Sequence, residues 1–175
     1  NMGSSIALSL IGQYETLVFD TDIEKAKAVT GAKVFSDVDE MLSQADIILI
    51  AVKPQILPSL YDLLSNYKNK KFISIAAGVP LEVLERNIGS SNIVRFMPNL
   101  AARSKNAVTA VAAAKQCDND FLSIALDVAN HFGSAFILDE ALFPAFIGIS
   151  GSAIAYVFEF VHALAMGGTD QGISY

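Results

Sequence analysis

Residues Asp46–Pro54 read DIILIAVKP, in which an apolar run ends in the small residues Ala51 and Val52 and is followed by Lys53 and Pro54. Continuous runs rich in Ile are typical of a β-strand that is covered on both faces, as in a parallel sheet. Outward from this run, other strand-like runs alternate with amphipathic stretches of about ten residues. The alternation predicts βαβ units and a mostly parallel sheet.

The rest of the chain can be divided in the same way. Strands are predicted at residues 15–20, 33–35, 46–52, 71–76, 92–97, 107–113 and 134–138. Helices are predicted over the opening residues and at 22–29, 37–45, 54–67, 79–88 and 118–132. From residue 139 onward only helical stretches follow, at 140–146 and 153–166. We therefore predict a Rossmann-like, doubly wound, mostly parallel α/β domain over residues 1–139, and the beginning of an all-helical domain over residues 140–175.

The composition is typical of a globular protein with a large core. Of the 175 residues, 53% are hydrophobic and 17% are charged, which argues against disorder. The net charge of −6 makes a nucleic-acid partner unexpected. The single cysteine, Cys117, excludes an internal disulfide and fits a reducing compartment such as the cytoplasm. From its apolar runs the chain is expected to have no leader and no membrane span, and no metal site is predicted.

The first three residues stand directly before a helical run. In a dinucleotide-binding fold, a G-x-G-x-x-G loop joins the first strand to the first helix, and its last glycine allows close helix packing. We expect Asn1, Met2 and Gly3 to be the end of such a loop, with the strand and two glycines upstream. The helical domain is likewise expected to continue beyond residue 175. The alternative is that Gly3 has no role.

Asp20 ends the next predicted strand, at the distance where an acid binds the adenosine ribose of a dinucleotide. An acid there favours the ribose diol of NAD and repels a 2′-phosphate, so we predict a preference for NADH over NADPH. The alternative is that Asp20 only caps the helix that follows it.

Three further strand ends carry small or polar residues, which are the positions where an open parallel sheet binds ligands. They are Ala51, Val52, Lys53 and Pro54; Ala76, Ala77 and Gly78; and Met97, Pro98 and Asn99. Pro54 is expected to begin a helix, and Asn99 offers an amide to a carboxamide or ribose. Each set also has a purely structural interpretation: a turn with a solvated Lys53, a tight turn that needs Gly78, and an Asx-turn at Asn99.

Four motifs, taken in their order and spacing, resemble those of the pyrroline-5-carboxylate reductase family. They are AVKP at 51–54, SIAAGVPLEVLE at 74–85, VRFMPN at 94–99 and ISGSAIAYVF at 149–158. The last is similar to the S-G-S-G-P-A-Y signature of that family, and Asn1-Met2-Gly3 is similar to the end of its G-x-G-N-M-G loop. The resemblance covers essentially the whole chain.

The resemblance implies reduction of the C=N bond of 1-pyrroline-5-carboxylate to proline, with hydride from NADPH or NADH. It implies that the nicotinamide lies near Ala76, Ala77, Pro98 and Asn99. It places the substrate carboxylate at Ser150, Gly151 and Ser152, where the predicted helix start offers hydroxyls, free amides and a favourable dipole. The alternative for these three residues is a helix cap.

No catalytic side chain is assigned, because the cofactor carries the hydride and a protonated imine is already electrophilic. His131 and His162 are expected to be structural, and Cys117 an inert thiol. The chain departs from the family at Ala101, which replaces a second proline, and at Ala153-Ile154, which replaces Gly-Pro.

The family completes its active site with later residues from a second subunit. A homodimer or higher oligomer is therefore expected, and this chain alone is not expected to be a competent enzyme. Two other functions stay open: reduction of a different imine or keto acid, and cofactor sensing without catalysis.

Overall fold

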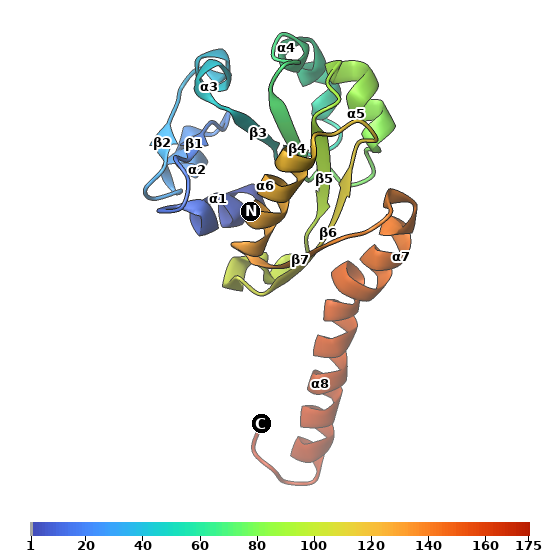
Figure 1. The fold of residues 1–175 in the computed structure, drawn as a ribbon. Helices are drawn as coiled ribbons and strands as arrows, with labels where there is room; N and C mark the ends of the chain where they lie inside the picture. The colour runs from blue at the N-terminus through green and yellow to red at the C-terminus, as the bar shows by residue number, and fades with distance from the viewer. Residues whose placement is uncertain (1) are drawn as a thin grey trace.

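The strand predicted at 46–52 forms the edge of a five-stranded sheet in the computed structural model, which describes residues 2–175. The interpretation of Asn1 lies outside the described residues. The strands, in sheet order, are β3 (Ile47–Ile50), β4 (Lys71–Ser74), β5 (Ile93–Met97), β6 (Ala107–Ala113) and β7 (Gly133–Ile137). All neighbours pair in parallel except β5 and β6 (Figure 1). The sheet is mostly parallel, as predicted.

Two short strands, β1 (Leu17–Val18) and β2 (Lys33–Val34), pair in parallel as a separate sheet beside β3 (Figure 1). No hydrogen-bonded ladder joins β1 to β3 among the described residues. In the doubly wound strand order, the first strand of the fold lies between the positions that β1 and β3 occupy here.

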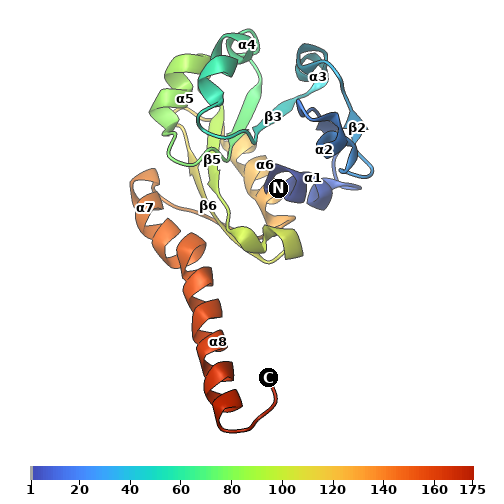
Figure 2. The ribbon, with the colours of Figure 1, turned by 180° about the vertical axis from the view of Figure 1, so that it is seen from behind.

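Helices cover both faces of the larger sheet (Figures 1 and 2). β5 is fully buried, and its successive side chains alternate between two cores: Val94 and Phe96 face one, Ile93 and Met97 the other. The first core is closed by α1 (Met2–Leu10) and α6 (Asn119–Asn130). The second is closed by α3 (Val38–Gln44), α4 (Tyr61–Ser65), α5 (Leu81–Ile88) and α7 (Phe143–Phe146). A short helix, α2 (Ile23–Lys27), connects β1 to β2.

The helix predicted to begin at Pro54 begins later, so that prediction was wrong. Pro54 lies in a turn in which the Ile56 amide donates to the Lys53 carbonyl at 2.9 Å. The first helical turn is the 3-10 segment η1 (Leu57–Leu60), and Pro58 is the proline at its start. Both prolines suit a first turn, and local sequence does not distinguish them.

The C-terminal part is one continuous helical stretch, Glu140–Asp170. It comprises the 3-10 turn η3 (Glu140–Leu142), α7, the π-helical segment η4 (Ile147–Ser152) and α8 (Ala153–Asp170). Phe143 and Phe146 are buried in the core of the sheet, whereas no residue of α8 is buried. We call η4 and α8 the helical arm, which projects away from the sheet (Figure 1). The predicted boundary after residue 139 therefore precedes the point where packing against the sheet ends.

The stretch Glu140–Asp170 is long and apolar enough to cross a membrane by length and composition alone. Its most apolar window has a mean hydropathy of 1.8 and is 11% buried. The expectation of no membrane span was drawn from the apolar runs, and it overlooked residues 141–158, which include no charged side chain. Core helices of soluble proteins can have the same length and apolar composition.

Candidate functional site

The starts and ends of several elements meet at one edge of the sheet. Because β3, β4 and β5 are parallel, their carboxyl ends share this edge. The start of α1 packs there against the end of β3: a Cβ added to Gly3 would lie 2.7 Å from Cβ of Ala51. This is the close packing expected of the last glycine in a dinucleotide loop. We call this edge the crevice edge.

The predicted crevice residues differ in exposure. Asp20, Ala51, Lys53, Ala77 and Gly78 are exposed; Met2, Gly3, Val52, Pro54 and Pro98 are half-buried; Ala76, Met97 and Asn99 are buried. After β4 the Ala76 amide donates to the Ser74 hydroxyl at 3.2 Å, and Gly78 turns with a φ of 74°. Gly78 therefore satisfies the geometry of the turn, and its missing side chain also leaves the backbone there open to a ligand.

The end of β1 carries two acids with different roles. Asp20 Oδ1 accepts from the Asp22 amide at 2.9 Å, while Asp22 caps α2 by accepting from the Glu24 amide. The alternative in which Asp20 caps this helix is therefore wrong. Lys25 forms an ion pair with Asp22 at 3.0 Å. The hydrogen bond to Asp22, followed by the negative charges of Asp22 and Asp20, raises the pKa of Lys25. The acid predicted to repel a 2′-phosphate thus has a lysine close by.

The Asn99 side chain is only 8% exposed and is committed to internal hydrogen bonds. Its Oδ1 accepts from the Ala101 amide at 3.3 Å, at the start of the 3-10 segment η2 (Leu100–Ser104), and from the Val108 amide at 3.4 Å. Its Nδ2 donates to Ser150 Oγ at 3.1 Å. The MPN and SGS motifs, recognised separately in the sequence, therefore meet in one hydrogen bond.

Ser150, Gly151 and Ser152 do not precede a free helix start, so that prediction was wrong. They belong to the π-helical segment η4, which continues from α7 into α8 without a break. Ser152 makes no side-chain cap hydrogen bond and has helical dihedral angles. Because the surrounding residues are helical, this segment does not present the free amides of a helix N-terminus.

An apolar hollow of about 660 Å³ lies between the crevice edge and the helical arm. Its polar side chains are Asn99 and Ser150. Its remaining lining residues are Ala101, Val108, Phe136, Phe146, Ile149, Ala153, Ile154, Val157 and Phe158. None of these described lining residues is charged, so the hollow suits the apolar face of a ring rather than an isolated charge.

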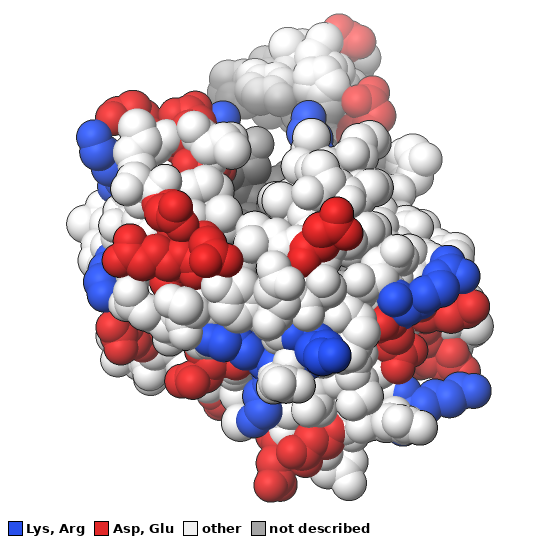
Figure 3. Space-filling model, turned by 90° about the horizontal axis from the view of Figure 1, so that it is seen from above, with Lys and Arg blue, Asp and Glu red and all other residues white. Residues whose placement is uncertain are grey.

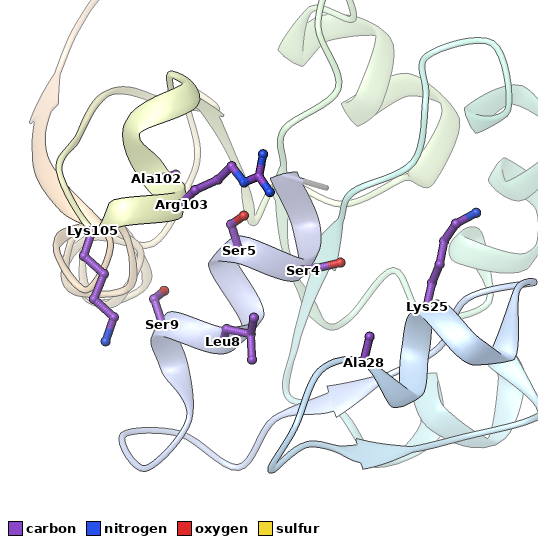
Figure 4. A pocket seen from close by; sticks show the side chains of 9 residues that line it. All are labelled: Ser4, Ser5, Leu8, Ser9, Lys25, Ala28, Ala102, Arg103 and Lys105. Atoms are coloured by element: carbon purple, nitrogen blue, oxygen red, sulfur yellow. The ribbon is translucent and has the colours of Figure 1, made fainter.

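A second hollow, of about 500 Å³, follows the outer side of α1. Its basic residues are Lys25 from α2, and Arg103 and Lys105 from η2 and its end (Figure 4). Figure 4 shows Arg103 reaching toward Ser5 in the first turn of α1, while Lys25 and Lys105 point in other directions. The sequence interpretation missed these residues, because they follow no strand end. Viewed from above, acidic and basic side chains are interspersed (Figure 3).

A partly buried ion pair, which sequence reasoning did not predict, links the sheet to the start of the C-terminal helical stretch. Arg95 Nη1 lies 2.6 Å from Glu140 Oε1, with side chains 7% and 26% exposed. The same Glu140 oxygen accepts from the Leu81 amide at 2.8 Å, and the guanidinium stacks over Phe143 at 5.0 Å. The signal in the sequence was a lone charge inside the apolar run at 92–97.

The histidines and the cysteine have local partners. His131 Nε2 lies 3.3 Å from Asp127 Oδ2, and His162 Nδ1 lies 3.2 Å from the Tyr175 hydroxyl. Burial, followed by the charge of Asp118, raises the pKa of the Cys117 thiol, which disfavours the reactive thiolate.

Comparison with known families matches the two parts of the chain separately. Residues 1–78 match the family described as NADP oxidoreductase coenzyme F420-dependent. Residues 140–175 match the family described as pyrroline-5-carboxylate reductase dimerisation.

Individual relatives match the chain as a whole. It is 36% identical to a pyrroline-5-carboxylate reductase of Methanosarcina acetivorans over 89% of the chain and 59% of that protein. It is 34% identical to the Aquifex aeolicus enzyme of the same name, over 100% of the chain and 68% of that protein. The Escherichia coli enzyme is 32% identical over 100% of the chain and 71% of its length. The chain thus spans less than two thirds of the first of these relatives.

Solved structures give the same picture. A pyrroline-5-carboxylate reductase from Coxiella burnetii superposes with a TM-score of 0.89 at 26% identity, over 99% of this chain and 68% of that one. The Plasmodium falciparum enzyme, solved with NADP bound, gives 0.86 at 27% identity, over 99% and 67%. An imine reductase from Myxococcus stipitatus, at 17% identity over 98% and 64% with a TM-score of 0.70, shares the fold.

Proposed function

Because the chain belongs to the pyrroline-5-carboxylate reductase family, we propose that the protein reduces the C=N bond of 1-pyrroline-5-carboxylate to L-proline with NADPH or NADH. The observation that supports this most directly is the crevice edge. There the start of α1 packs on the end of β3, and the MPN and SGS motifs are hydrogen bonded to each other.

The residues of the crevice edge fit a dinucleotide. Gly3 leaves no room for a side chain between α1 and β3, so the first turn of α1 stays close to the strand end. Ala51, Ala77 and Gly78 are exposed and small, so the backbone of β3 and β4 is open to a flat ligand. Asp20 is exposed at the position proposed for the adenosine ribose.

The residues of this chain supply orientation more than acid–base chemistry. The cofactor, when bound, supplies the hydride. Ala76, Ala77 and Pro98 border the position proposed for the nicotinamide, and Asn99 keeps the adjoining backbone rigid through its three hydrogen bonds. The apolar hollow beside Asn99 offers an uncharged surface to the pyrroline ring. A second copy packed along the arm would close it and exclude water from the imine carbon.

The proposed assembly is a homodimer or higher oligomer in the cytoplasm. Residues 140–175 match a dimerisation family, and α8 has no buried residue in the single chain. A second copy packed along the arm would cover its apolar side chains and close the hollow beside Asn99.

The function is tested with the purified full-length protein. It is mixed with 1-pyrroline-5-carboxylate and NADH or NADPH, while absorbance of the reduced nicotinamide and formation of proline are followed. We expect stoichiometric loss of reduced cofactor and gain of proline. Cofactor binding without proline formation would contradict the proposed reaction and favour a different substrate or a sensor.

Cofactor preference is tested on the same assay. From the carboxylate of Asp20 we expect a lower KM with NADH than with NADPH, and we expect Asp20→Asn to narrow that difference by roughly tenfold. The matched control is Asp39→Asn, which removes the charge of an acid on α3. An unchanged ratio of the two KM values in Asp20→Asn would remove Asp20 from the ribose site.

A further inference from the structure

Several contacts fasten the C-terminal helical stretch to the sheet domain, and four of them follow one another along the chain to Ser150. The first is the ion pair between Arg95 and Glu140. The next two are the buried rings of Phe143 and Phe146, of which the second packs edge-on against Phe136 at 5.7 Å. The fourth is the hydrogen bond from Asn99 to Ser150, after which no residue of α8 is buried.

Ser150, the hydrogen-bond partner of Asn99, lies in a segment where the backbone is π-helical instead of α-helical. The segment η4, Ile147–Ser152, is π-helical between two α-helical segments. A widened turn of this kind adds one residue and rotates everything after it by about 100° around the helix axis. Such turns are frequent at functional sites. Here the turn sets both the contact of Ser150 and the direction in which the arm presents its side chains.

Asn99 is a rigid partner for this contact. Its side chain is 8% exposed, and its oxygen is fixed by the amides of Ala101 and Val108. The Nδ2 group that remains is the one that donates to Ser150. A fixed donor on the crevice edge therefore holds a hydroxyl on the arm, and both residues line the apolar hollow.

We propose that Ser150 is a positioning residue that holds the helical arm in register with the crevice edge through Asn99, and that it does not bind the substrate carboxylate. The inference rests on the proposed function and deepens it. Ser150 then affects the reduction of any small cyclic imine to the same extent, with or without a carboxylate. A carboxylate-binding Ser150 would affect only substrates that carry the carboxylate.

The test uses the full-length protein and the variants Ser150→Ala, Asn99→Ala and the double variant. Ser123→Ala is the matched control, because that hydroxyl donates only within α6, to the Asn119 carbonyl at 2.9 Å. Each protein is assayed with 1-pyrroline-5-carboxylate and with 1-pyrroline, which lacks the carboxylate. We expect Ser150→Ala to lower kcat/KM by roughly fivefold to tenfold with both imines, as expected for one lost hydrogen bond. In the Asn99→Ala background we expect the same change to cost less than about twofold.

Two kinetic results would overturn the inference. One is a loss confined to the substrate with a carboxylate, which would make Ser150 a ligand of that group. The other is an additive effect of the two substitutions on 1-pyrroline-5-carboxylate, even if 1-pyrroline is not reduced at all.

Amide hydrogen exchange of residues 147–152 gives a readout that needs no activity. We expect faster exchange there in Ser150→Ala and in Asn99→Ala than in Ser123→Ala. Unchanged exchange in both variants would overturn the positioning role of Ser150. If the wild-type protein reduces neither imine but the two variants exchange faster, the proposed function is refuted while the contact between Asn99 and Ser150 is supported.

Discussion

At the scale of single residues, Gly3 shows how one missing side chain sets the geometry of the crevice edge. A Cβ at this position would lie 2.7 Å from Cβ of Ala51, and both atoms belong to rigid backbone elements. We expect Gly3→Ala to lower the free energy of unfolding by about 1–3 kcal/mol and to weaken NADH binding, because α1 must move away from β3. Gly167→Ala is the control, since nothing lies within 4 Å of an added Cβ in that helix. It should raise stability by about 0.5–1 kcal/mol. Urea unfolding and cofactor titration measure both, and equal stability of the two variants would contradict the packing argument.

At the scale of elements, a hydrogen bond ties the turn after α1 to α6 and makes stability depend on pH. Tyr14 donates to Asp127 Oδ2 at 2.6 Å, and this bond, followed by burial, raises the pKa of Tyr14 from 10.0 to about 12. The folded state therefore retains the phenol proton that the unfolded chain loses first. The contribution is complete below about pH 10 and is lost as pH rises toward 12. We expect the unfolding free energy of the wild type to fall more steeply than that of Tyr14→Phe between about pH 10 and pH 12 in urea titrations. Parallel pH profiles would show that the bond does not contribute.

At the scale of the whole molecule, the arm carries more apolar surface than a single chain can cover. Tyr156, Phe158, Phe160 and Leu164 are each more than 60% exposed on α8. We expect Phe160→Glu to weaken self-association of the full-length protein by roughly a hundredfold, because a buried unpaired carboxylate costs several kcal/mol. Ile23→Glu, at an exposed apolar position on α2, should leave the oligomer unchanged. Sedimentation velocity compares the three proteins. An unaltered mass for Phe160→Glu would place the interface elsewhere.

Much of the fold was predictable because its signals are local. Apolar runs of strand length alternate with helical periodicity, and these periods depend only on neighbouring residues. The strand at 107–113 and the change to purely helical sequence near residue 139 were therefore readable directly. Local rules could not decide between Pro54 and Pro58 as the start of a helix. They also could not detect the π-helical segment, which has no simple composition signal.

The sequence by itself determined the alternating architecture, the order of the strand ends and the motifs that identify the family. The tertiary structure alone decided which of those motifs touch. Asn99 and Ser150 lie 51 residues apart, and Arg95 and Glu140 lie 45 apart, yet each pair is within hydrogen-bond distance. Such contacts depend on how sheet and helices pack, and no local propensity encodes a partner at that separation. For the same reason the serine motif, interpreted locally as a helix start, proved to lie inside a continuous helical stretch, where Ser150 is hydrogen bonded to Asn99.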